Sequence, residues 1–178
     1  MSRPIPRQPA PSLSFPLVGG GEWSLADRSP DNFSMLVFYR GLHCPVCRRY
    51  LRELEGLVTD YSERGVETVA VSMDDRDRAE RAREEWELSE LPLGYGLDEE
   101  TARAWGLYLS AAIKEEEPEL FSEPGLFLVE PDGELYYAAI NSMPFGRPSL
   151  EEMLKSVDFV LDKEYPARGE VERAGATV

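Results

Sequence analysis

A Cys-x-x-Cys pair set between an apolar segment and a helical pattern is the feature that most restricts how this chain can fold. Residues 34–39 form an apolar run of strand length, and Cys44-Pro45-Val46-Cys47 follows five residues later. From Val46 to Tyr61, apolar side chains recur every three or four residues, which predicts a helix. Pro45 suits its first turn, where a missing N–H loses no partner. The pair is therefore expected at a strand-to-helix turn.

The two thiols are predicted to be chemically reactive. With only two residues between them, they can close a disulfide, and this spacing suits switching between thiol and disulfide better than stapling a fold. A helix N-terminus favours the thiolate of Cys44, and thiolate is the reactive form. Positive charge beside the pair adds to this effect, and the sequence supplies it from Arg40, His43, Arg48 and Arg49.

These residues allow other interpretations. A structural zinc ion asks for four ligands, whereas the motif offers two thiols and the adjacent His43, the only histidine of the chain. An inert cysteine pair is the second alternative. For His43, a role as an electrostatic neighbour of Cys44, or as a plain loop residue, is favoured over a role as a catalytic base.

The remaining pattern alternates strands and helices, which predicts an α/β fold with a mixed central sheet flanked by helices. Trp23, Trp86 and Trp105 are expected to pack inside. Residues 107–122 fit an inserted loop or helix near the active face. The expected elements are an N-terminal hairpin over 15–25, strands at 34–39, 66–71 and 91–95, helices at 45–61, 75–87 and 98–106, a hairpin of strands 124–129 and 134–140, and a final helix from Leu150, capped by Ser149.

A chain of 178 residues is long enough for one domain with a proper core. We expect a flexible N-terminal arm over residues 1–14, a single domain over 15–165 and a flexible tail over 166–178. The formal net charge of −15 argues against nucleic acid and anionic membranes as partners, because both reward basic patches. Residues 1–11 lack the apolar core of a signal peptide, so a cytoplasmic location is expected, where a cysteine pair is more often catalytic than structural.

The motif and its setting resemble the thioredoxin-like superfamily. The N-terminal hairpin, Phe38-Tyr39 and the Pro131-Asp132-Gly133 turn are similar to its peroxiredoxin-like branch, the alkyl hydroperoxide reductase and thiol-specific antioxidant (AhpC/TSA) family. The resemblance covers about residues 13–162. Compared with the peroxiredoxin pattern, Arg40 replaces a Pro, Cys44 replaces a Thr, and the downstream Arg has no counterpart in residues 121–125.

The resemblance implies two orders of events at the pair. Read as a thioredoxin, Cys44 is the exposed attacking cysteine, Cys47 is the buried resolving cysteine, Pro124 is a cis proline facing them, and Phe38 replaces a buried Asp. Read as a peroxiredoxin, Cys47 is peroxidatic and Cys44 resolves it. The departures from the peroxiredoxin pattern favour Cys44 as the attacking residue.

These expectations define a thiol–disulfide oxidoreductase whose redox pair is Cys44–Cys47, supported by Arg40, His43, Pro45 and Pro124. A thiol-dependent peroxidase with antioxidant activity is the first alternative. A redox-gated binding module using residues 107–122 is the second. The expected partners are a protein or small-molecule disulfide, or a peroxide, together with a thiol reductant system. No metal or other cofactor is expected, and the oligomeric state stays open, a homodimer included.

Overall fold

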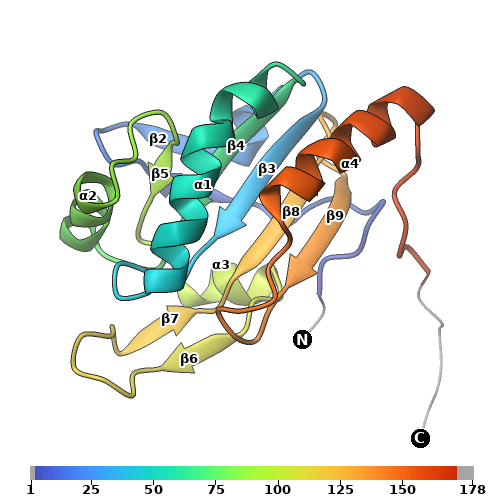
Figure 1. The fold of residues 1–178 in the computed structure, drawn as a ribbon. Coiled ribbons are helices and arrows are strands. Elements are labelled where there is room, and N and C mark those ends of the chain that lie inside the picture. Colours follow the sequence, from blue (N-terminus) through green and yellow to red (C-terminus); the bar gives the residue numbers. More distant parts are fainter. Residues whose placement is uncertain (1–2, 172–178) are drawn as a thin grey trace, which may run out of the picture.

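The computed structural model describes residues 3–171. A mixed sheet of five strands forms its centre, in the order β5-β4-β3-β8-β9 (Figure 1). The central strand β3 runs parallel to β4 and antiparallel to β8. The predicted α/β fold with a mixed sheet is confirmed. The strands of this sheet are β3 (Phe33–Phe38), β4 (Val66–Val71), β5 (Leu93–Gly94), β8 (Gly125–Val129) and β9 (Leu135–Ile140).

Helices cover both faces of the sheet. Successive side chains of the buried strand β3 therefore point alternately into two hydrophobic cores. Met35 and Val37 face the core beneath α1 (Pro45–Ser62) and α4 (Leu150–Lys163), which lie together on one face in Figure 1. Ala82 of α2 (Arg76–Glu85) joins the same core. Leu36 and Phe38 face the second core, which contains Trp23 from the hairpin and Trp105 after α3 (Glu99–Ala104). Trp23, Trp86 and Trp105 are all buried, as predicted.

The N-terminal segment packs against both edges of the sheet. The predicted hairpin is formed by β1 (Ser14–Pro16) and β2 (Glu22–Ser24), which a short 3-10 turn, η1 (Leu25–Asp27), follows. Beyond β1, the Val18 N–H donates to the Leu93 carbonyl of β5. At the other edge, Arg7 N–H donates to the Leu135 carbonyl, and Leu135 N–H donates to the Gln8 carbonyl. These contacts differ from the flexible arm expected over residues 1–14.

The C-terminal segment also returns to the domain before the described residues end. Ala167 is buried, and the Arg7 guanidinium lies 4.0 Å from the Glu170 carboxylate. These contacts involve residues that were expected to belong to a flexible tail. The rest of that tail, residues 172–178, lies outside the described part of the chain.

Residues 107–122 form a two-stranded antiparallel hairpin rather than a plain loop or a helix. Its strands are β6 (Leu109–Ala111) and β7 (Leu120–Ser122), and it projects beside the first turn of α1 in Figure 1. This position near the α1 N-terminus agrees with the expected location at the active face.

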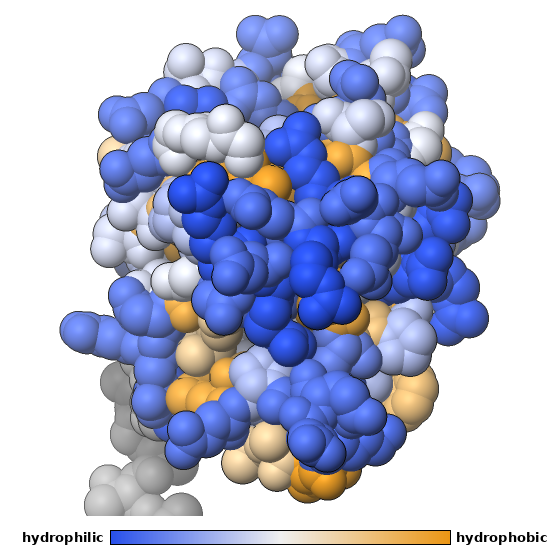
Figure 2. All heavy atoms as spheres, turned by 90° about the vertical axis from the view of Figure 1, so that its left-hand side faces the viewer, coloured by the Kyte–Doolittle hydropathy of each residue, from blue (hydrophilic) through white to orange (hydrophobic). Residues whose placement is uncertain are grey.

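The side of the molecule that carries α2 is mostly hydrophilic (Figure 2). On α2 itself only Ala79 and Ala82 are buried, so most of the surface of this helix faces solvent. Within residues 3–171, no helix combines the length and the apolar character needed to cross a bilayer.

Candidate active site

The cysteine pair lies where the chain turns from β3 into α1. Cys44 is the N-cap residue of α1, and its Sγ accepts a hydrogen bond from the Cys47 N–H at 3.2 Å. Pro45 occupies the first helical turn, as predicted. Both thiols are free, and their exposed fractions are 1% for Cys44 and 0% for Cys47. The exposed Cys44 implied by the thioredoxin resemblance is therefore not found, because the pair belongs to the core beneath α1.

The surroundings of Cys44 favour its thiolate. A hydrogen bond from the Cys47 side chain is the largest influence, and together with the Cys47 N–H it outweighs burial and lowers the pKa of Cys44 to about 6. The Arg147 charge and a hydrogen bond from the Arg40 side chain act in the same direction. A free thiol has a pKa of about 8.5, so Cys44 is mostly ionised at pH 7.

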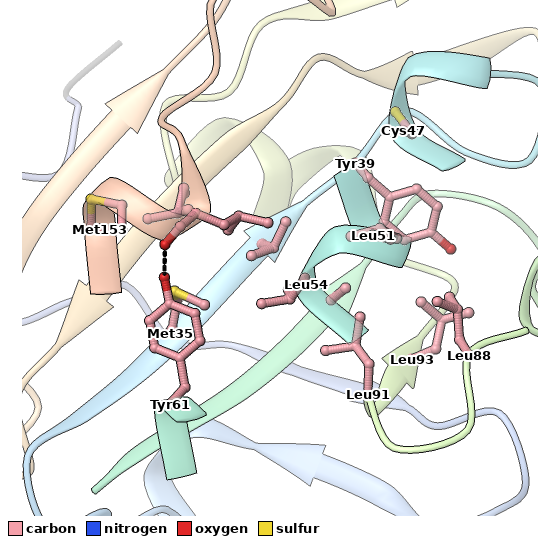
Figure 3. Close-up of a cluster of buried hydrophobic side chains, with 14 of the residues drawn as sticks. Met35, Tyr39, Cys47, Leu51, Leu54, Tyr61, Leu88, Leu91, Leu93 and Met153 are labelled. Atoms are coloured by element: carbon pink, nitrogen blue, oxygen red, sulfur yellow. Dashed lines mark hydrogen bonds between the residues drawn. The ribbon is translucent and has the colours of Figure 1, made fainter. Parts of the chain in front are cut away.

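Cys47 has the opposite character. Burial is the main cause that raises the pKa of Cys47 well above its ordinary value, and the hydrogen bond to Cys44 adds to it. Figure 3 shows Cys47 at the upper end of the apolar cluster, near Tyr39. One thiol is thus poised as an anion, while its neighbour stays protonated and donates to it.

An arginine reaches Cys47 from a loop that the sequence analysis did not consider. The Arg147 Nη2 atom donates to Cys47 Sγ at 2.9 Å, and its guanidinium carbon lies 5.0 Å from the centre of the Tyr50 ring. The Tyr50 hydroxyl fixes the same loop by donating to the Pro148 carbonyl at 2.7 Å. Residues 121–125, where the family resemblance places a downstream Arg, contain no arginine, whereas Arg147 lies later in the chain. The signal that could have identified Arg147 is its position two residues before Ser149, the predicted N-cap of the final helix. That helix, α4, packs beside α1 (Figure 1).

Arg40 is held by the β6–β7 hairpin and the residue that follows it. Its Nε atom lies 3.2 Å from a Glu123 carboxylate oxygen, and its Nη2 atom lies 3.9 Å from Glu117. The guanidinium also stacks over the Phe121 ring at 4.7 Å. Glu117 of the hairpin therefore places a carboxylate beside a cation of the active-site turn.

His43 does not add the positive charge expected from it. Its ring meets Phe121 edge-on at 4.7 Å between centroids, and neither ring nitrogen has a hydrogen-bond partner among the described residues. Burial, followed by the neighbouring Arg40 charge, lowers the pKa of His43 below its usual value, so the ring is neutral at pH 7. Arg48 and Arg49 are exposed, and Arg48 donates to the Glu85 carbonyl. The cations acting on the thiols are therefore Arg40 and Arg147.

Two implications of the thioredoxin resemblance are wrong. No peptide bond among residues 3–171 is cis, so Pro124 is trans. Its ring is buried and helps to line a small cavity with Arg147 and Tyr50. Phe38 packs against Trp105 and Phe127 on the opposite face of the sheet from the pair, so it occupies no place from which a side chain could assist Cys47.

The donor set does not favour a metal. Within the described residues, no three side chains of His, Cys, Asp or Glu converge in a way that could hold a metal ion. The two sulfurs instead have each other, backbone N–H groups and guanidinium groups as neighbours.

Comparisons with known proteins agree with this fold and motif. Solved structures that resemble it include the peroxidoxin BcpB from Mycobacterium tuberculosis, with a TM-score of 0.72 and 16% identity over 89% of this chain and 99% of that one. A reduced 2-Cys peroxiredoxin from Plasmodium vivax gives a TM-score of 0.69 and 18% identity, over 88% and 96% of the two chains. Peroxiredoxin 6 from Arenicola marina gives 0.73 and 16%, over 89% and 74%.

At these identities the structural matches establish a peroxiredoxin-like form of the thioredoxin fold. A search of curated proteins found no significant match. The family model described as AhpC/TSA family matches residues 6–138, which include the hairpin, the cysteine pair and most of the sheet. The chain therefore belongs to the AhpC/TSA family.

Proposed function

We propose that this protein is a thiol–disulfide oxidoreductase in which Cys44 is the attacking cysteine. The observation that carries the proposal is the contrast between the two sulfurs at the start of α1. Cys44 Sγ accepts hydrogen bonds from Cys47, which lower its pKa to about 6, whereas burial keeps Cys47 protonated. Membership of a family named for thiol-dependent reduction supports redox chemistry at this pair.

The reaction consists of two exchange steps. The Cys44 thiolate attacks one sulfur of a substrate disulfide, which forms a mixed disulfide and releases the other sulfur as a thiolate. Cys47 then attacks Cys44 Sγ, and the proton that it loses is taken up by the departing substrate thiolate. This second step releases the reduced substrate and leaves a Cys44–Cys47 disulfide, which an external thiol reductant reverses.

Access to Cys44 requires a local movement. Its exposed fraction is 1%, so a disulfide reaches the sulfur only after a neighbouring segment gives way. We therefore expect the turn before α1 to open when the disulfide enters and to close again around Cys44 afterwards. Such gating by a loop is common in enzymes.

Trapping the mixed disulfide tests the proposal. Cys47→Ser removes the resolving thiol, so a model protein disulfide should accumulate on Cys44 as a covalent adduct visible by mass spectrometry. Cys44→Ser is the matched control and should form no adduct. If instead the adduct accumulates on Cys47 in Cys44→Ser, and none forms on Cys44 in Cys47→Ser, the order of attack is reversed.

A thiol peroxidase is the second candidate, and the contact of Arg147 with Cys47 favours it. A guanidinium 2.9 Å from Cys47 Sγ stabilises a thiolate there once the proton has left. In that case the Cys47 thiolate attacks one peroxide oxygen, the O–O bond breaks, and the other oxygen leaves with a proton as water or an alcohol. The resulting sulfenic acid then condenses with Cys44 to give the disulfide and a second leaving group, water. Rapid mixing with hydrogen peroxide separates the candidates, because a rate no faster than that of a free thiol would exclude the peroxidase.

A further inference from the structure

Asp74 is a buried carboxylate that lies against the active-site turn from outside the cysteine motif. It follows β4, and its side chain has no exposed surface. One carboxylate oxygen accepts the Leu42 N–H at 2.7 Å, and the other accepts Arg78 Nε at 2.8 Å. Leu42 stands two residues before Cys44, so this carboxylate holds the backbone that leads into the helix N-terminus.

The turn is shaped to receive this carboxylate. Gly41 has φ +130°, a backbone conformation that residues other than glycine rarely adopt. A Cβ atom placed on Gly41 would lie 2.7 Å from both Asp74 oxygens, too close for any real side chain. The missing side chain of Gly41 therefore makes the room in which the Asp74 carboxylate meets the backbone.

Asp74 is itself fixed by neighbours on other elements. Its N–H donates to Ser72 Oγ at 3.3 Å, and its carbonyl accepts the Gly96 N–H at 2.8 Å. Its partner Arg78 continues the chain of contacts, because Arg78 Nη2 donates to the Glu116 carbonyl of the β6–β7 hairpin at 3.3 Å. The carboxylate thus joins the sheet, the first turn of α2 and the hairpin to the active-site turn.

We propose that Asp74 is a positioning residue of the thiol chemistry, which holds the Gly41–Cys44 turn so that Cys44 Sγ faces the N-terminus of α1. The role of Asp74 in disulfide exchange rests on the proposed function, whereas its effect on the position and pKa of Cys44 does not depend on any substrate. The turn that it holds is closed by Cys44 N–H, which donates to the Gly41 carbonyl at 3.1 Å. The Cys44 backbone then adopts the extended N-cap conformation that lets Sγ accept the Cys47 N–H.

A positioning role and a purely electrostatic role predict opposite results. The groups that act most on the Cys44 thiolate are Cys47, Arg147 and Arg40. Removing a nearby negative charge would, by itself, make the thiolate more stable and lower the pKa of Cys44. Releasing the turn would instead weaken the hydrogen bonds to the thiolate and raise the pKa. The sign of the change in Asp74→Ala therefore separates the two roles.

The experiment measures the rate of iodoacetamide alkylation at Cys44 against pH, with the modified peptide identified by mass spectrometry. In Asp74→Ala the apparent pKa should rise by about one unit, which makes alkylation about tenfold slower at pH 5. Asp74→Asn keeps a carbonyl oxygen for the Leu42 N–H and should remain close to the wild type. Asp75→Ala removes the neighbouring N-cap side chain of α2 and should leave the Cys44 profile unchanged.

An unchanged or lowered Cys44 pKa in folded Asp74→Ala, or an equal rise in Asp74→Asn, would overturn the proposal. Near-UV circular dichroism establishes folding. If Asp74→Ala does not fold, Gly41→Ala disturbs the same contact from the other side and must raise the Cys44 pKa for the proposal to stand. Because no disulfide substrate is present, failure of the trapping experiment leaves this test intact.

Discussion

The Arg147 guanidinium donates to Cys47 Sγ across 100 residues of sequence, at a distance of 2.9 Å. The contact depends on the loop between β9 and α4, which the Tyr50 hydroxyl ties to α1. Arg147 therefore acts on both cysteines, whereas Arg40 acts on Cys44. The two cations are held by different elements, so their effects can be separated by mutation.

Arg147→Gln should slow the step in which Cys47 attacks the mixed disulfide. The substitution removes a charge-assisted hydrogen bond worth roughly 1.5–3 kcal/mol and leaves the Cys47 thiolate less stable. We expect release of the reduced substrate to become about tenfold slower or more, measured by rapid quench and mass spectrometry. Arg49 is exposed and lines a surface groove together with Arg147, so Arg49→Gln is the control and should leave that rate unchanged. Equal rates in the two variants would contradict the assignment.

Alkylation of Cys44 should reach half of its maximal rate near pH 6. The thiolate reacts and its pKa is about 6, so the rate should be constant above pH 7 and fall about tenfold per unit below pH 5. Cys47→Ala removes the S–H donor and should move the half-point to higher pH. Cys47→Ser keeps a donor and should move it less. A half-point near pH 8.5 in the wild type would show that Cys44 is an ordinary thiol.

Glu55→Gln should destabilise the fold more at neutral pH than in acid. The Glu55 carboxylate of α1 accepts hydrogen bonds from the N–H groups of Ser89, Glu90 and Leu91, all at 2.8 Å. Burial opposes ionisation, but these donors outweigh it and lower the pKa of Glu55. After screening by solvent the loss should be about 1 kcal/mol.

The pH dependence of this effect has a definite sign. The folded pKa of Glu55 is depressed, so its contribution is complete above the unfolded value of about 4.3 and disappears as the pH falls through the folded value. Urea unfolding at pH 7 should separate Glu55→Gln from the wild type, and at pH 3, below the unfolded pKa, the difference should be smaller. Glu53→Gln, on the same helix and exposed, should unfold like the wild type at both pH values.

Tyr61→Phe should lower the free energy of unfolding by about 1 kcal/mol. The buried Tyr61 hydroxyl donates to the Leu150 carbonyl at 2.7 Å, which links the end of α1 to the start of α4 (Figure 3). Tyr136→Phe is the matched control, because its hydroxyl makes a bond of the same length to Tyr165 at the surface. If both variants lost the same stability in urea unfolding, burial of the Tyr61 bond would contribute nothing.

Much of the fold could be predicted from local sequence patterns. The run ending at Tyr39, the helical period after Pro45 and the Pro131-Asp132-Gly133 turn each determine an element with few alternatives, and each was found close to its expected position. Residues 107–122 gave no such signal, because each strand of that hairpin is only three residues long. Their strand character depends on pairing with each other and on contacts with the active-site turn.

The site was only partly predictable, since its electrostatics come from tertiary contacts. Spacing identified Cys44 and Cys47, and proximity in sequence identified Arg40. The same reasoning assigned a charge to His43, which burial and Arg40 remove. It also missed Arg147 and Asp74, which reach the turn from the β9–α4 loop and from the end of β4.

The N-terminal segment that reaches both edges of the sheet has a consequence for assembly. Exposed edge strands offer unpaired N–H and C=O groups to other chains and are a common route to aggregation. Here the backbone near Arg7 bonds to the start of β9, and the backbone near Val18 bonds to β5. A second molecule could add a strand at either of these places only by displacing the segment. Residues 3–18 therefore protect these two places from pairing with strands of other molecules.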